Sequence, residues 1–213
     1  MPDYDANSIK TNLERLIYKF QADTGVFLQG GNDLYGLLDG IKSYMNLPNP
    51  EVKAKAQGIQ SQIYFQLDEF KRIQILGSEK IAQALTLKST METDPVWKSM
   101  IDNQWKILGF ATLANAVKKA TDAVSLTNEL LKVKTQMDNH INSIQAIRDD
   151  FKKLNNMAQG KGFAVNLSSA ASSALSSTMT NILKPASMIV AAGLAIYLFG
   201  PALLGKTLRA VRK

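Results

Sequence analysis

Apolar residues recur at intervals of three and four along most of the chain, which is the spacing of one face of an α-helix. Residues 8–22 and residues 32–47 each carry such a stripe. Between them, residues 25–31 are rich in glycine, and they predict a loop that joins two short helices. We expect the apolar centre of this loop, residues 26–28, to fill the core of its own domain; the alternative is an exposed tip that touches a membrane or partner.

Two Asx-Pro pairs mark the starts of longer helices. In Asn49-Pro50 and Asp94-Pro95, the first side chain can accept hydrogen bonds from free backbone N–H groups, and proline suits the first helical position. The first pair predicts a helix of about 35 residues, with Gly58 and Gly77 either weakening it or allowing close approach of a neighbour. The second predicts a helix that continues, without a break, to about residue 157.

A heptad pattern occupies the second half of that helix. Its spacings alternate between three and four, which predicts a coiled-coil seam within the chain or between chains. The seam begins at Ala123 and continues through Leu126, Leu130, Val133, Met137, His140, Ile144, Ile147, Phe151 and Leu154. His140 is the only histidine. A polar residue at such a position is expected to fix register or oligomeric state. A pH switch is the alternative.

The chain changes character after residues 159–162, Gln-Gly-Lys-Gly, which predict a hinge. Residues 163–183 carry no charge and are crowded with serine and alanine. Ser169, Ser173 and Ser177 recur every four residues, a spacing of small residues that lets helices pack closely in membranes. Two interpretations stay open, a membrane-associated helical segment and a flexible linker.

The strongest signal is the uncharged, apolar stretch 185–205. Its 21 residues would form a helix of about 31 Å, which matches the hydrocarbon core of a bilayer. We predict a transmembrane helix whose residues include Pro185, Met188, Ile189, Leu194, Ile196, Tyr197, Phe199, Pro201 and Leu204. The alternative is a helix buried in a large soluble protein, but the rest of the chain offers little that could enclose it.

The tail after this stretch is basic, with cations at Lys206, Arg209, Arg212 and Lys213. Residues 151–213 hold eight of the 25 cations and none of the 18 acids, so the first 150 residues are close to neutral. Such asymmetry predicts contact with anionic lipid or nucleic acid at the C-terminus. The tail favours a cytoplasmic C-terminus, yet no secretory signal peptide is expected that would export the preceding residues.

The predicted fold is therefore all-α: an elongated helical bundle or coiled-coil hairpin with a C-terminal transmembrane helix. We divide the chain into N-terminal short helices (1–47), long antiparallel helices with the seam (48–158), a hinge with a Ser/Ala-rich segment (159–184), the membrane span (185–205) and the basic tail (206–213). Long seamed helices with a membrane segment resemble, by architecture alone, helical tubes and minor membrane proteins of bacterial viruses, and α-helical pore-forming toxins.

Composition gives no support to catalysis. The chain has no cysteine and one histidine, so common triads and most metal sites are unavailable. We expect no cofactor and no small-molecule substrate. The leading hypothesis is an oligomeric structural protein of a virion or injection apparatus that anchors in a membrane or forms a conduit through it. The alternatives are a pore-forming toxin or translocator that inserts from solution, and a cellular membrane-tethered scaffold.

Overall fold

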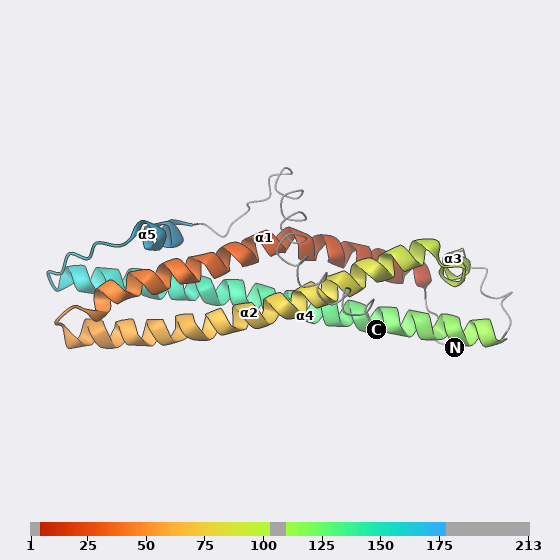
Figure 1. Cartoon of the computed structure of the whole chain (residues 1–213), viewed down its shortest axis with the longest axis horizontal. Helices are drawn as coiled ribbons and strands as arrows, with labels where there is room; N and C mark the ends of the chain where they lie inside the picture. Colours follow the sequence, from red (N-terminus) through yellow and green to blue (C-terminus); the bar gives the residue numbers. More distant parts are fainter. Residues whose placement is uncertain (1–4, 103–109, 178–213) are drawn as a thin grey trace, which may run out of the picture. The chain divides into compact units, whose positions relative to one another are not determined.

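The structure is a computed structural model that describes residues 5–102 and 110–177 (Figure 1). Five helices cover about 90% of these residues, and the described part of the chain contains no strand. The helices are α1 (Ala6–Met45), α2 (Pro50–Thr93), α3 (Pro95–Ile101), α4 (Phe110–Gly160) and α5 (Ser169–Ser176). The prediction of an all-α protein is confirmed.

The chain forms two compact units, and α1, α2 and α4 each contribute to both. The described part of the first unit consists of residues 5–23, 75–102 and 110–135, and that of the second consists of residues 24–74 and 136–177.

The predicted loop at residues 25–31 is wrong, because α1 continues through it as a single helix of 40 residues. Phe27 is buried in this helix, as expected of the apolar centre of the segment. A Cβ atom added to Gly31 would lie 2.4 Å from the ring of Phe70 in α2. Glycine here permits close contact between two helices, and that packing outweighs its weak helix propensity.

Both predicted helix starts are confirmed. Asn49 Oδ1 accepts from the backbone N–H groups of Glu51 and Val52 at 3.1 and 3.0 Å. Asp94 Oδ1 accepts from Val96 and Trp97 at 2.9 and 3.1 Å. The carboxylate of Asp94 also binds Lys119 at 2.6 Å, and this contact is the largest cause of a lowered Asp94 pKa. Each cap thus satisfies donors that the first helical turn leaves free.

The expectation of one unbroken helix from residue 96 to about residue 157 is wrong. Helix α3 ends after seven residues, and Asp102 caps its C-terminus through its backbone N–H. The side chain of Trp97 is only 1% exposed, so α3 is held by burial of the largest apolar side chain available to it. Residues 103–109 lie outside the described part of the chain, which resumes with α4.

The predicted hinge coincides with the end of α4. Gly162 has a φ of 82°, which glycine adopts at little cost. Its N–H donates to the carbonyl of Gln159 at 2.9 Å, and the N–H of Phe163 donates to the carbonyl of Ala158 at 3.0 Å. This pair of bonds defines a Schellman motif, which stops the helix and turns the chain.

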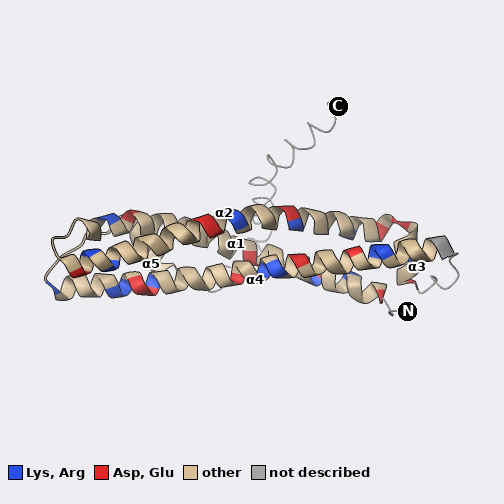
Figure 2. Ribbon diagram, turned by 90° about the horizontal axis from the view of Figure 1, so that it is seen from below, with Lys and Arg blue, Asp and Glu red and all other residues tan. Residues whose placement is uncertain are grey.

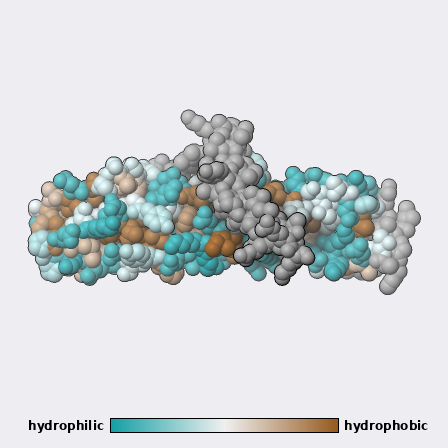
Figure 3. All heavy atoms as spheres, viewed as in Figure 1, coloured by the Kyte–Doolittle hydropathy of each residue, from teal (hydrophilic) through white to brown (hydrophobic). Residues whose placement is uncertain are grey.

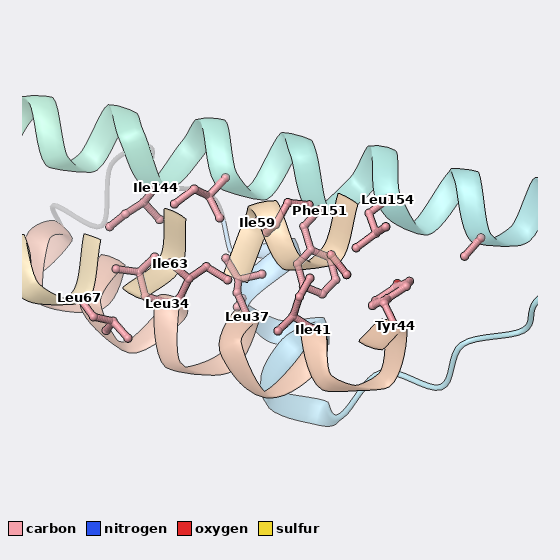
Figure 4. Packing of buried hydrophobic residues seen from close by; sticks show 14 of the residues in the cluster. Leu34, Leu37, Ile41, Tyr44, Ile59, Ile63, Leu67, Ile144, Phe151 and Leu154 are labelled. Carbon is pink, nitrogen blue, oxygen red and sulfur yellow. The ribbon is translucent and has the colours of Figure 1, made fainter. Parts of the chain in front are cut away.

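The stripe predicted as a coiled-coil seam is a packing face within the chain. Nine of its ten residues are buried, and Leu126 is half-buried. In the second unit, Ile144, Ile147, Phe151 and Leu154 of α4 meet apolar side chains of α1 and α2 (Figure 4). The α1 and α2 residues labelled in the figure are Leu34, Leu37, Ile41, Tyr44, Ile59, Ile63 and Leu67. The intrachain version of the seam is therefore the one present in this structure.

Charged residues of both signs are interspersed along α1, α2 and α4 (Figure 2). On the face drawn in Figure 3, apolar side chains form separate spots among hydrophilic ones. The helical part of the chain thus has the mixed-charge surface that its near-neutral composition predicts.

Candidate functional site

The candidate site is the strap, which we define as residues 163–177, together with the face of the second unit on which it lies. Residues 163–168 belong to no helix, and Phe163, Val165 and Leu167 are half-buried against the core while the residues between them are exposed. This alternation is that of an extended chain with one face on a core. Helix α5 follows, so the Ser/Ala-rich segment is ordered and docked through residue 177, and the linker interpretation fails there.

Helix α5 lies against the glycine face of α1, beside which it is drawn in Figure 1. A Cβ atom added to Gly36 would be 2.7 Å from the carbonyl oxygen of Ala170, and one added to Gly40 would be 2.6 Å from the Cβ atom of Ala171. Ala171 and Ala174 are almost fully buried. Small residues on both helices therefore permit a close approach. Ser169 and Ser173 of the predicted four-residue stripe do not take part, because both are exposed.

A buried polar group, the Arg148 cluster, joins the end of the strap to two helices. Arg148 of α4 pairs with the carboxylate of Asp33 in α1, and their side chains are 1% and 5% exposed. Arg148 also donates to the hydroxyl of Ser177 and, at 3.0 Å, to its carbonyl oxygen. The Ser177 hydroxyl donates to Asp33 at 2.7 Å, and Gln29 donates to the other Asp33 oxygen at 2.9 Å. Gln145 of α4 also accepts from Arg148 at 3.4 Å, so five residues form one connected network.

The energetics of this cluster differ from those of a surface ion pair. Two charges taken out of water must recover a large desolvation cost, which requires good geometry and further hydrogen bonds. Here Ser177 and Gln29 supply those bonds, although Arg148 Nε has no partner among the described residues. The cluster consequently fixes how α1 and α4 meet, because separating these helices would leave a buried charge unpaired. Ser177 adds hydrogen bonds from the end of α5 to this pair.

Polar contacts also hold the strap at its start and middle. Lys161, which lies two residues before the strap, forms an ion pair with Glu51 of α2. Ser168 caps α5 by accepting from the N–H of Ala171 at 3.2 Å. Its side chain also hydrogen-bonds Asp39 of α1, and this bond is the largest cause of a lowered Asp39 pKa. The strap is thus tied to the helices at several points along its length.

His140 lies in a second polar site of the same unit. Its ring packs against Phe70 and Phe27, with centroid distances of 5.9 and 5.3 Å. Its Nδ1 atom is 2.8 Å from Gln66 Oε1, and Nε2 is buried without a partner among the described residues. Burial lowers the pKa of His140 to about 4, against a weaker opposing effect of Glu69. His140 is therefore neutral at physiological pH.

A pocket of about 190 Å³ adjoins His140. Its lining residues come from α2 and α4 and comprise Phe65, Gln66, Glu69, Ile73, Gln136, Asn139, His140 and Ser143. Gln136 Oε1 is also buried without a partner in the described part of the chain, so two buried polar atoms that lack such a partner border the pocket. Within the described residues, no group of three or more acids and histidines is arranged to hold a metal ion.

The predicted membrane residues, from Pro185 to Leu204, and the basic tail, from Lys206 to Lys213, lie outside the described residues. Among the helices that the structure does describe, none combines the length and apolarity needed to cross a membrane. The seam residues, in contrast, lie in the core of the chain.

Sequence reasoning missed four residues of the strap site, namely Asp33, Gly36, Gly40 and Arg148. One signal was present: Ile144, Ile147, Arg148 and Phe151 follow the spacing of a single helical face, which directs the arginine toward the core. The glycines at 36 and 40 have the four-residue spacing of a close helix contact.

Comparison with known proteins does not place the chain in a family. No family model, curated protein or solved structure matches it. Its function must therefore be argued from its own residues.

Proposed function

We propose that this chain is a non-enzymatic, membrane-associated structural protein. Its helical body, residues 5–102 and 110–160, carries a C-terminal membrane module, residues 185–213. The observation that carries the proposal is the uncharged, apolar stretch 185–205 with four cations directly after it. A helix of this length fits a bilayer, and the cations suit anionic headgroups. The absence of acids after residue 150 makes the whole module compatible with a negatively charged surface.

The strap supports the proposal that the helical body and the membrane module have separate roles. It leads from the helical body toward the predicted span, and it is tied to the body by the Arg148 cluster and the glycine face of α1. The body has its own apolar core in the second unit, so it can serve as a rigid support. We propose further that the protein works as a homo-oligomer, as a component of a virion or injection apparatus that anchors in a membrane or forms a passage through it.

Flotation with lipid vesicles tests the membrane assignment. The full-length protein is mixed with vesicles of equal parts phosphatidylcholine and phosphatidylglycerol and centrifuged through a density gradient. We expect the full chain to float and a variant lacking residues 185–205 to remain at the bottom. A matched control replaces 185–205 with an unrelated apolar span, which should restore flotation. A deletion variant that floats as well as the full chain would contradict the proposal.

A second measurement distinguishes the assembly from its alternatives. Projection images of the detergent-solubilised protein should show a ring or tube if the chain forms a conduit. A uniform population of single rods would contradict the oligomeric version while leaving the membrane anchor intact. Dye release from the same vesicles, lost on deletion of 163–205, would instead favour the pore-forming alternative.

A further inference from the structure

We propose that the strap is a releasable tether: α5 leaves the glycine face of α1 when the C-terminal module enters a membrane. This inference rests on the proposed function, and it names the part of the body that must move. Its basis is the composition of the contact between α5 and the second unit. The apolar side chains of α5 that are fully buried are alanines, Ala171 and Ala174, which bury little apolar surface. Leu175 also packs against the core, but it is only partly buried.

The polar contacts of α5 allow it to leave while the charges of Asp33 and Arg148 stay paired with each other. Asp33 and Arg148 bind each other directly, and Gln29 also binds Asp33. If α5 departs, these three residues remain paired, and the bonds lost at the cluster are those to the hydroxyl and carbonyl groups of Ser177. Both Ser177 groups can then be satisfied by water. Release therefore avoids the high cost of leaving a buried ion unpaired.

The eight residues of α5 also need the docking surface to stay helical. Isolated helices shorter than about 12 residues are marginal in water. Undocking is therefore expected to coincide with melting of α5, which frees a flexible chain rather than a rigid rod. The Schellman motif at Gly162 keeps the end of α4 intact when this happens. Its hydrogen bonds involve only residues 158–163, all of which precede α5.

The consequence for function is a change of reach. With Ser177 bound to Arg148, the seven residues 178–184 can separate the body from the predicted span by at most about 25 Å. With α5 released, residues 169–184 can extend to about 55 Å. A docked strap thus holds the predicted membrane segment near the body, and a released strap lets the segment cross a bilayer while the body stays outside.

Cysteine protection tests the release directly, because the natural chain contains no cysteine. In Ala174→Cys the thiol is buried under α1 while α5 is docked. We expect its alkylation rate to rise at least tenfold when the protein binds phosphatidylcholine–phosphatidylglycerol vesicles. The matched control is Ala56→Cys in α2, which is equally buried in the same unit and should remain slow to react. Hydrogen exchange of residues 171–177 in the unmodified chain supplies the same readout without a substitution.

A locked variant provides the converse test. A Cβ atom on Gly36 would lie 3.2 Å from that of Ala174 and 2.7 Å from the carbonyl oxygen of Ala170. Gly36→Cys with Ala174→Cys therefore needs α5 to shift away from α1 before a disulfide of normal geometry can form. We expect the oxidised variant to lose membrane insertion, measured as protection of 185–205 from protease by the bilayer, and the reduced variant to regain it. Gly36→Cys with Ser173→Cys, on the exposed face of α5, should not form the bond.

The outcomes separate this inference from the proposed function. Vesicle flotation of the full chain reports on the function alone. If the chain floats but the rate at Ala174→Cys and the exchange of residues 171–177 stay unchanged, the tether is overturned and the membrane assignment stands. If the oxidised variant inserts as well as the reduced one, the tether is also overturned. If the chain does not float, the membrane assignment fails, and the tether fails with it.

Discussion

At the scale of single residues, His140 carries the clearest link between packing and solution conditions. Its ring lies between two phenylalanines, and the charged residue that most affects it, Glu69, is already paired with Arg72. The flanking segment 24–31 of α1 and the segment 139–147 of α4 contain no charged residue. A proton on His140 would therefore place a charge in a mostly apolar layer, which is the physical reason for its low pKa.

This arrangement predicts acid destabilisation. The His140 pKa is about 4 in the folded chain against 6.5 for the free side chain, so between these pH values the unfolded state binds more protons. Stability is fully present above pH 6.5 and falls as the pH drops to 4, by about 3 kcal/mol from this residue alone. Urea denaturation of the natural chain and of His140→Leu at pH 7.5 and 4.5 measures the difference, since carboxylate titration is common to both. Titration of the single histidine near pH 6.5, followed by NMR, would contradict it.

The buried pair of Arg148 and Asp33 predicts that substitutions at the two positions have non-additive effects on the free energy of unfolding. Replacing one member of the pair leaves the other buried and unpaired, so Arg148→Met or Asp33→Leu should each lower the free energy of unfolding by about 3–5 kcal/mol. The double variant removes both charges and should cost much less than the sum. A double-mutant cycle from urea denaturation gives the coupling energy. Additive effects would show that the two side chains do not depend on each other.

At the scale of elements, replacing two glycines of one helix with alanine is predicted to change the stability of the chain in opposite directions. Gly25 and Gly40 both lie in α1, but a Cβ atom meets nothing within 4 Å at Gly25, whereas at Gly40 it lies 2.6 Å from Ala171 and 3.0 Å from Phe151. Gly25→Ala should therefore stabilise the chain by about 1 kcal/mol through helix propensity. Gly40→Ala should destabilise it by about 1–3 kcal/mol through overpacking.

Hydrogen exchange locates the second effect. In Gly40→Ala, the amides of α5 should lose protection, while those of α3, in the other unit, should not change. Equal stabilisation by both substitutions would contradict the close contact between α1 and α5.

The same helix shows what the sequence could and could not predict. The starts of α2 and α3 were predictable because Asn49 and Asp94 act on backbone groups two and three residues away. The continuity of α1 was not, because the role of Gly31 depends on Phe70, which arrives from another helix. The candidate site was hidden for a similar reason: the helical spacing directs Arg148 toward the core, but its partner Asp33 is 115 residues away in the sequence.

At the scale of the whole molecule, the uneven distribution of charge is the feature that its proposed function must explain. The mixed-charge helices shown in Figure 2 have no evident preference for an anionic surface, whereas the region after residue 150 has eight cations and no acid. If the C-terminal module meets a membrane, the two kinds of interaction should be separable: apolar transfer by residues 185–205, and electrostatic attraction by the four cations that follow.

This separation gives a testable prediction for the basic tail. Replacing Lys206, Arg209, Arg212 and Lys213 with glutamine removes attraction worth about 1 kcal/mol per residue near an anionic surface. Binding to vesicles with phosphatidylglycerol should weaken at least tenfold, and binding to pure phosphatidylcholine should change little. Raising the salt concentration should weaken the natural chain toward the level of the variant, because screening acts on the same attraction. A tail variant that kept its preference for anionic vesicles would move the source of that preference to the helical body, and the acid-free module would then need a different partner.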